Sequence, residues 1–193
     1  MKAMGSAYES SGRTGQKQRT RDHLVTTIRQ LLAQGVSPTV DQVAEASGIS
    51  RTTTYRYFPN QHALLLAAHP EIDRTTILEP DAPSDPRLRL ELALDEQFRI
   101  LIEWEPQLRA SLRASLEPGT PQPPLRGGRA IGWFEDALRP LGTNRARSLA
   151  IAIRAAAGIE PYVWLRDIAH RSPAQAVKIM RGNALAIFDH ATA

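Results

Sequence analysis

The sequence predicts an all-α fold, and three observations lead to this prediction. Apolar residues recur at helical spacing along most of the 193 residues. No segment shows the strict apolar–polar alternation of a half-buried strand. Residues that begin or end helices, such as Thr39, Gly48 and Pro86, lie at the borders of the periodic segments. The sequence therefore predicts consecutive helices joined by turns.

Four helices are expected in the first third of the chain. The apolar stripe of the first consists of Leu24, Ile28, Leu31 and Leu32. This helix ends at Gly35, and the motif TVDQ then begins the second helix as a capping box with Thr39 as N-cap. The second helix stops at Gly48. Ser50 caps the third helix and Asn60 caps the fourth, QHALLLAAH.

Longer helices are expected after residue 70. DPRLRLELALDEQFRILIEW and PQLRASLRASLE are amphipathic, with Pro86 and Pro106 in their first turns. The Pro/Gly-rich segment Pro118–Gly128 predicts a loop, and RAIGWFEDALRPL follows it. Residues 144–170 predict one long apolar helix with a kink near Gly158–Pro161. SPAQAVKIMRGNALAIFDH predicts the last helix.

The excess of positive charge lies in the N-terminal third. Residues 1–68 hold eight Lys/Arg and four Asp/Glu, a balance of +4, and the remaining 125 residues hold sixteen of each. Either a solvated basic tail or a domain that binds a polyanion would explain this asymmetry, and charge alone does not distinguish between them. The absence of cysteine excludes disulfides and thiol chemistry.

The sequence also argues against several classes of protein. The polar N-terminus has no apolar segment typical of a signal peptide, and no uncharged stretch approaches the ~20 residues of a membrane span. We therefore expect a cytoplasmic protein without membrane contact. The five histidines form no metal-binding spacing, and neither a P-loop nor a nucleophile elbow is present. We expect no enzyme activity, metal or cofactor. A purely architectural DNA-binding protein would not need the charge-neutral helices after residue 68.

The segment VAEASGISRTTTYRYFPNQHALL has the features of a helix-turn-helix. Ala44 and Gly48 supply the small residue and the turn glycine that two crossing helices require. The small core is expected to contain Val40, Val43 and Ile49, with Thr54 and Phe58 facing inward from the next helix. The outward residues are then Thr52, Tyr55 and Arg56, flanked by Arg51 and Thr53. Hydroxyls and guanidinium groups on an exposed helix suit phosphates and base edges of DNA. The alternative interpretation of this segment is a polar helical hairpin in which the turn glycine is incidental.

The stretch TVDQVAEASGISRTTTYRYFPNQHALL resembles the DNA-binding signature of TetR-family transcriptional regulators. The resemblance covers about residues 20–68. It implies a homodimer with about nine helices per chain. The expected regions are a flexible arm at 1–16, a helix-turn-helix DNA-binding domain at 17–60, and a helical effector-binding and dimerisation domain at 61–193. Two residues depart from the family pattern. Thr54 replaces an apolar residue, and Gln61 replaces a lysine that helps to hold a DNA phosphate.

The expected DNA contacts follow from this resemblance and from side-chain chemistry. The recognition-helix positions are Arg51, Thr52, Thr53, Tyr55 and Tyr57. Arg51 is the best candidate for guanine, Thr52 suits a thymine methyl, and the two tyrosines suit phosphates. Thr39 and Gln61 are further phosphate candidates. Lys17, Arg19 and Arg21 precede the expected first helix. The sequence does not decide whether they contact DNA or belong to a solvated arm. It also does not decide whether Arg56 reaches DNA.

An effector site is expected in the C-terminal domain. Its candidate residues are the aromatic side chains of Phe98, Trp104, Trp133, Phe134, Tyr162 and Trp164. Packing in the core or in a dimer interface is the alternative for each of them. Arg99, Glu103, Arg109, Arg113 and Glu160 could orient a polar group of a ligand or form ordinary surface ion pairs.

The sequence therefore predicts a ligand-responsive regulator with double-stranded DNA as its partner. We expect a repressor that binds a near-palindromic operator as a homodimer, paired through the last two helices. An unidentified apolar or amphipathic small molecule is expected to release it from the operator. A TetR-like activator or an effector-independent regulator is the alternative. The helix from Gln61 is expected to connect the DNA-binding hairpin to the C-terminal domain.

Overall fold

Every regular element in the part of the chain that the structure describes is helical, which confirms the predicted all-α fold. The structure is a computed structural model, and it describes residues 5–69, 74–116 and 128–193. The chain divides into two units, Met1–His69 and Pro70–Ala193. None of the described helices is long and apolar enough to cross a membrane.

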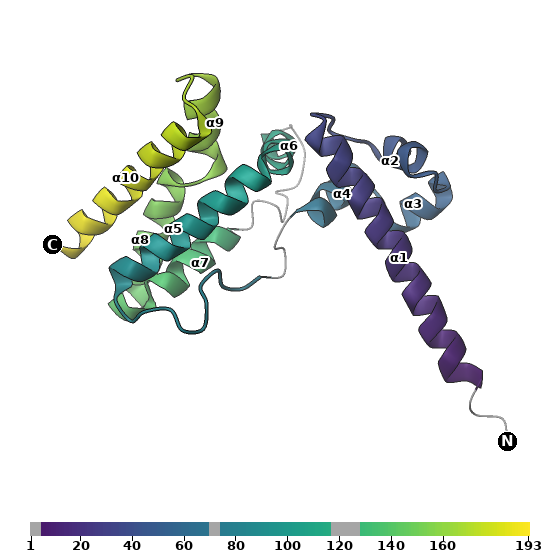
Figure 1. Cartoon of the computed structure of the whole chain (residues 1–193), viewed down its shortest axis with the longest axis horizontal. Coiled ribbons are helices and arrows are strands. Elements are labelled where there is room, and N and C mark those ends of the chain that lie inside the picture. Colours follow the sequence, from purple (N-terminus) through teal and green to yellow (C-terminus); the bar gives the residue numbers. More distant parts are fainter. Residues whose placement is uncertain (1–4, 70–73, 117–127) are drawn as a thin grey trace. The chain divides into compact units, whose positions relative to one another are not determined.

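The described residues of the N-terminal unit, 5–69, form four helices (Figure 1). They are α1 (Gly5–Ala33), α2 (Val40–Ser47), α3 (Arg51–Tyr57) and α4 (Gln61–Ala68). The C-terminal half of α1 packs against α2 and α4, and α2 packs against α3. Their shared core contains Leu24, Ile28, Leu32, Val40, Val43, Phe58, Leu64 and Leu65, all of which are buried. Three short helices are thus held on one long helix by a small apolar core.

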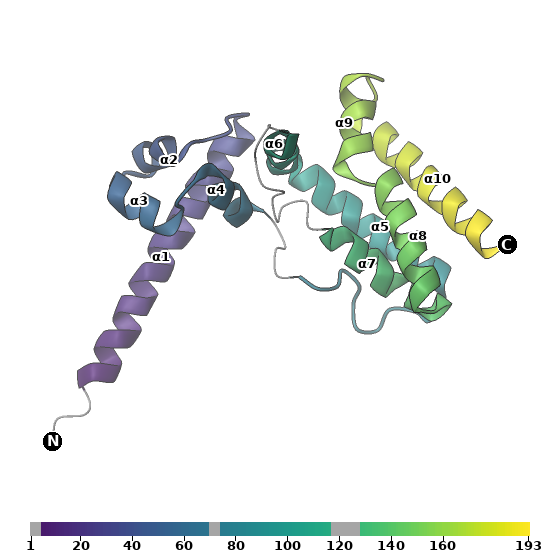
Figure 2. The same ribbon diagram turned by 180° about the vertical axis from the view of Figure 1, so that it is seen from behind.

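Helix α1 begins earlier than the sequence predicts. Residues 5–16, which we expected to form a flexible arm, are helical, and their first turns project beyond α2–α4 (Figures 1 and 2). Lys17, Arg19 and Arg21 consequently lie within α1 and not before it. Sequence reasoning places helices by their apolar stripe, and a projecting helix needs none, because polar residues such as Gln, Lys and Arg have good helix propensity.

The predicted helix caps are present. Thr39 Oγ1 accepts a hydrogen bond from Gln42 N at 3.3 Å, and Gln42 Oε1 accepts one from Thr39 N at 2.8 Å, which completes the capping box. Ser50 and Asn60 cap α3 and α4 through their side chains. Helix α4 ends at Ala68 and belongs to the N-terminal unit. We expected this helix to connect the DNA-binding hairpin to the C-terminal domain, and this expectation was wrong.

The C-terminal unit contains six α-helices in its described residues (Figure 2). They are α5 (Pro86–Glu103), α6 (Glu105–Leu116), α7 (Arg129–Ala137), α8 (Thr143–Ala156), α9 (Ile159–Asp167) and α10 (Pro173–Thr192), with the 3-10 helix η2 (Arg139–Leu141) before α8. Helix α8 packs between α7 and α10, α5 packs on α7 and α10, and α9 packs on α6 and α10. The core includes Leu94, Leu101, Phe134, Ile153 and Met180.

The predicted long helix at 144–170 is two helices. Helix α8 ends at Ala156, Gly158 adopts an extended conformation (φ −99°, ψ −176°), and α9 begins at Ile159. Pro161 explains the break, because it lacks an N–H and its ring would clash with the carbonyl of Ala157 in a continuous helix. The predicted loop at 118–127 lies outside the described residues.

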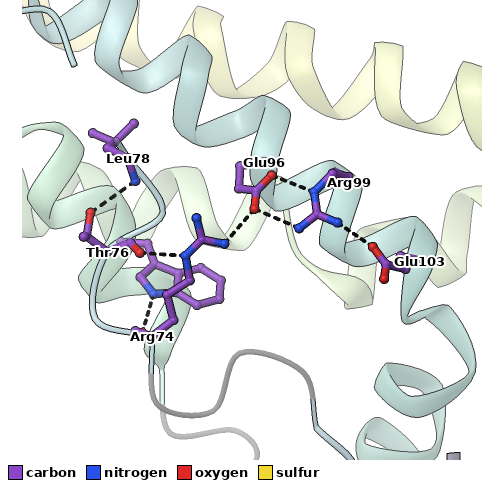
Figure 3. Close-up of polar contacts among 7 residues, drawn as sticks. Arg74, Thr76, Leu78, Glu96, Arg99 and Glu103 are labelled. Carbon is purple, nitrogen blue, oxygen red and sulfur yellow. Dashed lines mark hydrogen bonds and ion pairs between the residues drawn. The ribbon is translucent and has the colours of Figure 1, made fainter. Parts of the chain in front are cut away.

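An irregular segment that begins at Arg74 is fixed to α5 and α7 by polar contacts (Figure 3). The indole Nε1 of Trp133 donates to Arg74 O at 2.9 Å, and Arg74 Nη1 lies 2.7 Å from Glu96 Oε1. Arg99 also donates twice to Glu96, at 2.7 and 2.9 Å. The hydrogen bonds from Arg99 and then from Arg74 outweigh the effect of burial and lower the pKa of Glu96 to about 2.

Candidate nucleic-acid interface

A tight turn joins α2 to α3. Gly48 ends α2 in the left-handed conformation (φ 69°), a region that residues with a side chain rarely adopt. The Ser47 hydroxyl donates to Ala44 O at 3.2 Å and accepts from Ile49 N at 3.3 Å. Ala44 is buried at the helix crossing, as predicted, whereas Ile49 is only half-buried. The glycine and the serine together fix the direction in which α3 leaves the turn.

Helix α3 turns one side to the core and the opposite side to solvent. Thr54 and Phe58 are buried, as the sequence predicts, and the Thr54 hydroxyl donates to Ser50 O at 3.1 Å. At 3.6 residues per turn, Thr52 and Arg56 lie on the opposite side, and both are exposed. A polar, hydrogen-bonding surface therefore runs along the outside of α3.

The two edges of this surface border different helices. On the α2 edge, Arg51 Nε lies 3.4 Å from Asp41 Oδ1, and 75% of the Arg51 side chain remains exposed. On the α1 edge, the Tyr57 hydroxyl donates to Lys17 O at 3.2 Å. The Arg56 guanidinium lies 5.7 Å from the centre of the Tyr57 ring. The ends of α3 are thus attached to α2 and α1 through polar side chains.

The structure brings most of the predicted DNA-binding residues to this region. Exposed candidates are Thr39, Arg51, Thr52 and Tyr55 on or beside α2 and α3, and Lys17, Arg19 and Arg21 on α1; Thr53 and Tyr57 are half-buried. Lys17 and Arg21 are one turn apart, so they share a side of α1. The bond between Tyr57 and Lys17 O shows that α3 ends beside the turn that carries Lys17.

Gln61 is engaged within the protein. Its Nε2 donates to Ser37 O at 3.1 Å and to Pro38 O at 3.2 Å, which lie in the connection between α1 and α2. Both hydrogens of the amide therefore have acceptors. A phosphate would require the same donors, so the structure gives Gln61 a role in holding the segment that precedes Thr39. The sequence pattern did not reveal this role, because Ser37 and Pro38 are remote from Gln61 along the chain.

Arg56 faces outward, as the sequence predicts, whereas the contact made by Asp41 was not apparent from the sequence. Arg56 lies at the centre of the outward side of α3, and helical spacing from Thr54 and Phe58 is the signal that identifies it. In the sequence, Asp41 stands out only as part of the capping motif TVDQ. Its contact with Arg51 depends on the angle between two helices, which no sequence spacing reports.

The six candidate effector residues of the C-terminal unit differ in burial. Phe98, Trp133, Phe134 and Tyr162 are buried in the core, Trp104 packs partly against it, and Trp164 is 57% exposed on α9. The Tyr162 hydroxyl donates to Glu105 Oε2 at 2.9 Å, and its burial raises its pKa to about 12. Five of these aromatic side chains thus pack in or against the core, the alternative that the sequence left open, whereas Trp164 is largely exposed.

Four of the five charged candidates of this unit have ion-pair partners. Arg99 bonds Glu96 and Glu103, Arg109 bonds Glu105 and Asp167, and Glu160 bonds Arg154. Arg113 is exposed. Among the described residues, no group of three or more His, Asp or Glu side chains is arranged to hold a metal ion.

Comparison with known proteins identifies one region. A family model described as the helix-turn-helix domain of resolvase matches residues 15–61. This range contains most of α1, all of α2 and α3, and the first residue of α4. A search of curated proteins finds no match to the chain. The match, the left-handed turn glycine and the polar outer side of α3 together show that the N-terminal unit carries a helix-turn-helix of the DNA-binding type.

Proposed function

We propose that the chain is a TetR-like transcriptional regulator, a homodimeric repressor that binds a near-palindromic operator and leaves it when a small molecule binds. The observation that carries the proposal is the outer side of α3, where hydroxyls and guanidinium groups lie beside the exposed cations of α1. Such a surface suits phosphates and the edges of base pairs. The alternatives within this class are an activator and a regulator without an effector; we do not propose an enzyme.

Arg51 reads a base pair and Tyr55 binds a phosphate in this proposal. Both are exposed on α3, and a guanidinium can bond O6 and N7 of guanine together. The test is selection of bound duplexes from a random library, followed by titration of operator variants. Arg51→Ala should cost ~1–3 kcal/mol and relax preference at one base pair, whereas Tyr55→Phe should weaken binding to all sequences alike. An unchanged binding profile for Arg51→Ala would refute this role.

The dimer forms through α8 and α10 in this proposal. A pocket of about 580 Å³ lies between these helices, and its lining includes Leu149, Ala152, Ala186 and Ile187. Ile151 and Ile179 are also exposed on the two helices. Pairing with the same helices of a second chain would remove this apolar surface from water.

Analytical ultracentrifugation tests the dimer. At micromolar concentration the wild-type chain should sediment as a species of twice 21.3 kDa. Ala186→Arg, at the pocket, should shift it to the monomer. Ile102→Arg, at an exposed apolar site on α5 outside the pocket, should leave the dimer intact. A wild-type monomer, or equal behaviour of both variants, would exclude this interface.

The effector binds inside the C-terminal unit in this proposal. In its described part, Gln97 and Gln107 each keep a buried side-chain oxygen without a hydrogen-bond donor. A buried acceptor without a partner costs ~1–3 kcal/mol, and an apolar ligand with a donor group would satisfy it. The test is a screen of amphipathic compounds by tryptophan fluorescence, followed by operator titrations. By linkage, an effector should weaken DNA binding typically by 1–3 kcal/mol; tight binding without this effect favours an effector-independent regulator.

A further inference from the structure

The ion pair between α2 and α3 combines two charges that should behave oppositely near DNA. Arg51 is the first residue of α3, and Asp41 lies in the first turn of α2. The two side chains are 75% and 48% exposed, and Arg51 Nε lies 3.4 Å from Asp41 Oδ1. An exposed pair of this kind contributes little to folding stability, typically 0.2–1 kcal/mol. The small stabilisation from this ion pair does not explain why a carboxylate lies on a surface that is proposed to face negatively charged DNA.

The geometry of the pair leaves part of the guanidinium available. Asp41 contacts Arg51 at Nε, and 75% of the Arg51 side chain remains exposed, so the terminal nitrogens stay accessible to a further partner. Those nitrogens form a planar two-donor fork, which is the group that bonds two acceptors of a guanine. A free arginine loses rotamer freedom when it binds, and a carboxylate that already restricts the side chain reduces that loss.

From these contacts we propose that Asp41 is a positioning residue for base recognition: it orients Arg51 through Nε and thereby determines specificity at one base pair. The inference rests on the proposed function, because it assumes that Arg51 meets DNA. It also predicts a cost, since the negative charge of Asp41 repels the phosphates of every sequence equally. Asp41 therefore trades general affinity for preference at the position that Arg51 reads.

The experiment measures the full chain on a selected operator and on the variants with the other three base pairs at the Arg51 position. Asp41→Asn should reduce the preference at that position about 3- to 10-fold, while affinity for unrelated duplexes stays equal or rises. Asp41→Glu should restore part of the preference, because it returns the carboxylate. Chemical denaturation of each variant shows that it is folded under the conditions of the titration.

Glu45→Gln is the matched control. Glu45 is an exposed carboxylate one turn further along α2, and its removal changes the charge of the same helix by the same amount. It should alter affinity for all duplexes alike and leave base preference unchanged. In an Arg51→Ala background, Asp41→Asn should have no effect on preference at this position, because the side chain that it orients is missing.

Two results would overturn the inference, and they are distinguishable. If Asp41→Asn and Glu45→Gln change affinity equally while the preference at every position stays intact, Asp41 acts only through its charge. If the wild-type chain shows no preference for any sequence, the proposed function fails, and the role of Asp41 fails with it.

Discussion

Gln61 offers a sharp test, because its sequence position suggests a phosphate contact and its structure shows an internal one. Its amide donates to Ser37 O and Pro38 O at 3.1 and 3.2 Å. A net contribution of ~0.5–1.5 kcal/mol per hydrogen bond, reduced by partial exposure, gives about 1–2 kcal/mol for Gln61→Ala. For a unit of this size, 1 kcal/mol shifts the melting temperature by about 4–8 °C. The N-terminal unit of Gln61→Ala should therefore melt several degrees early.

The assay separates the two units by their chromophores. All three tryptophans lie in the C-terminal unit, so early melting should appear in far-UV circular dichroism and not in tryptophan fluorescence. Gln30→Ala is the control, since Gln30 is an exposed glutamine of α1 and its replacement should change stability by less than ~0.5 kcal/mol. If Gln61→Ala melts like the wild type but loses affinity for DNA, Gln61 is a phosphate contact and our reasoning is wrong.

Three further predictions concern single residues, each measured by chemical denaturation. Gly48→Ala should cost about 0.5–1 kcal/mol: the left-handed backbone (φ +69°) disfavours a side chain, no atom lies within 4 Å of the added Cβ, and reduced freedom of the unfolded chain offsets part of the strain. Thr54→Val should leave the free energy of unfolding unchanged or raise it by up to ~1 kcal/mol, because Ser50 O keeps its hydrogen bond from Thr54 N at 2.9 Å. A decrease of more than ~1 kcal/mol would contradict this prediction. Glu96 has a pKa of about 2 in the folded chain, below its ordinary 4.5, so its stabilisation is complete above about pH 5 and disappears as the pH falls towards 2. Glu96→Gln should remove this acid sensitivity and at most about 3 kcal/mol of stability at pH 7, and an unaltered pH profile would show that the contacts with arginine are unimportant.

The sequence predicts the N-terminal helices well wherever local chemistry decides. Thr39, Ser50 and Asn60 cap their helices as expected, because capping involves residues only three positions apart. The inward positions of Thr54 and Phe58 follow from helical spacing. In contrast, the first turns of α1 were missed because they have no apolar stripe, and the break before Pro161 was underestimated as a kink.

The candidate site could be predicted only in part. Residue types and spacing place Arg51, Thr52 and Tyr55 on one exposed surface. The partners of these residues come from other parts of the chain: Asp41 for Arg51, Lys17 for Tyr57, and Ser37 and Pro38 for Gln61. These contacts depend on how helices pack, which the pattern of one helix does not contain. For the same reason, composition alone could not distinguish core aromatic residues such as Phe134 from residues that line a pocket.

The central claim is that α3 reads a DNA sequence, and one titration tests it most directly. Fluorescence anisotropy compares binding of the wild-type chain to a labelled operator, recovered from the random library, and to a scrambled duplex of equal length and composition, at several salt concentrations. Specific recognition predicts that the operator binds ~10³-fold or more tightly than the scrambled duplex at physiological salt, and that binding to both weakens as salt rises. Equal affinity for the two duplexes at every salt concentration would contradict the claim.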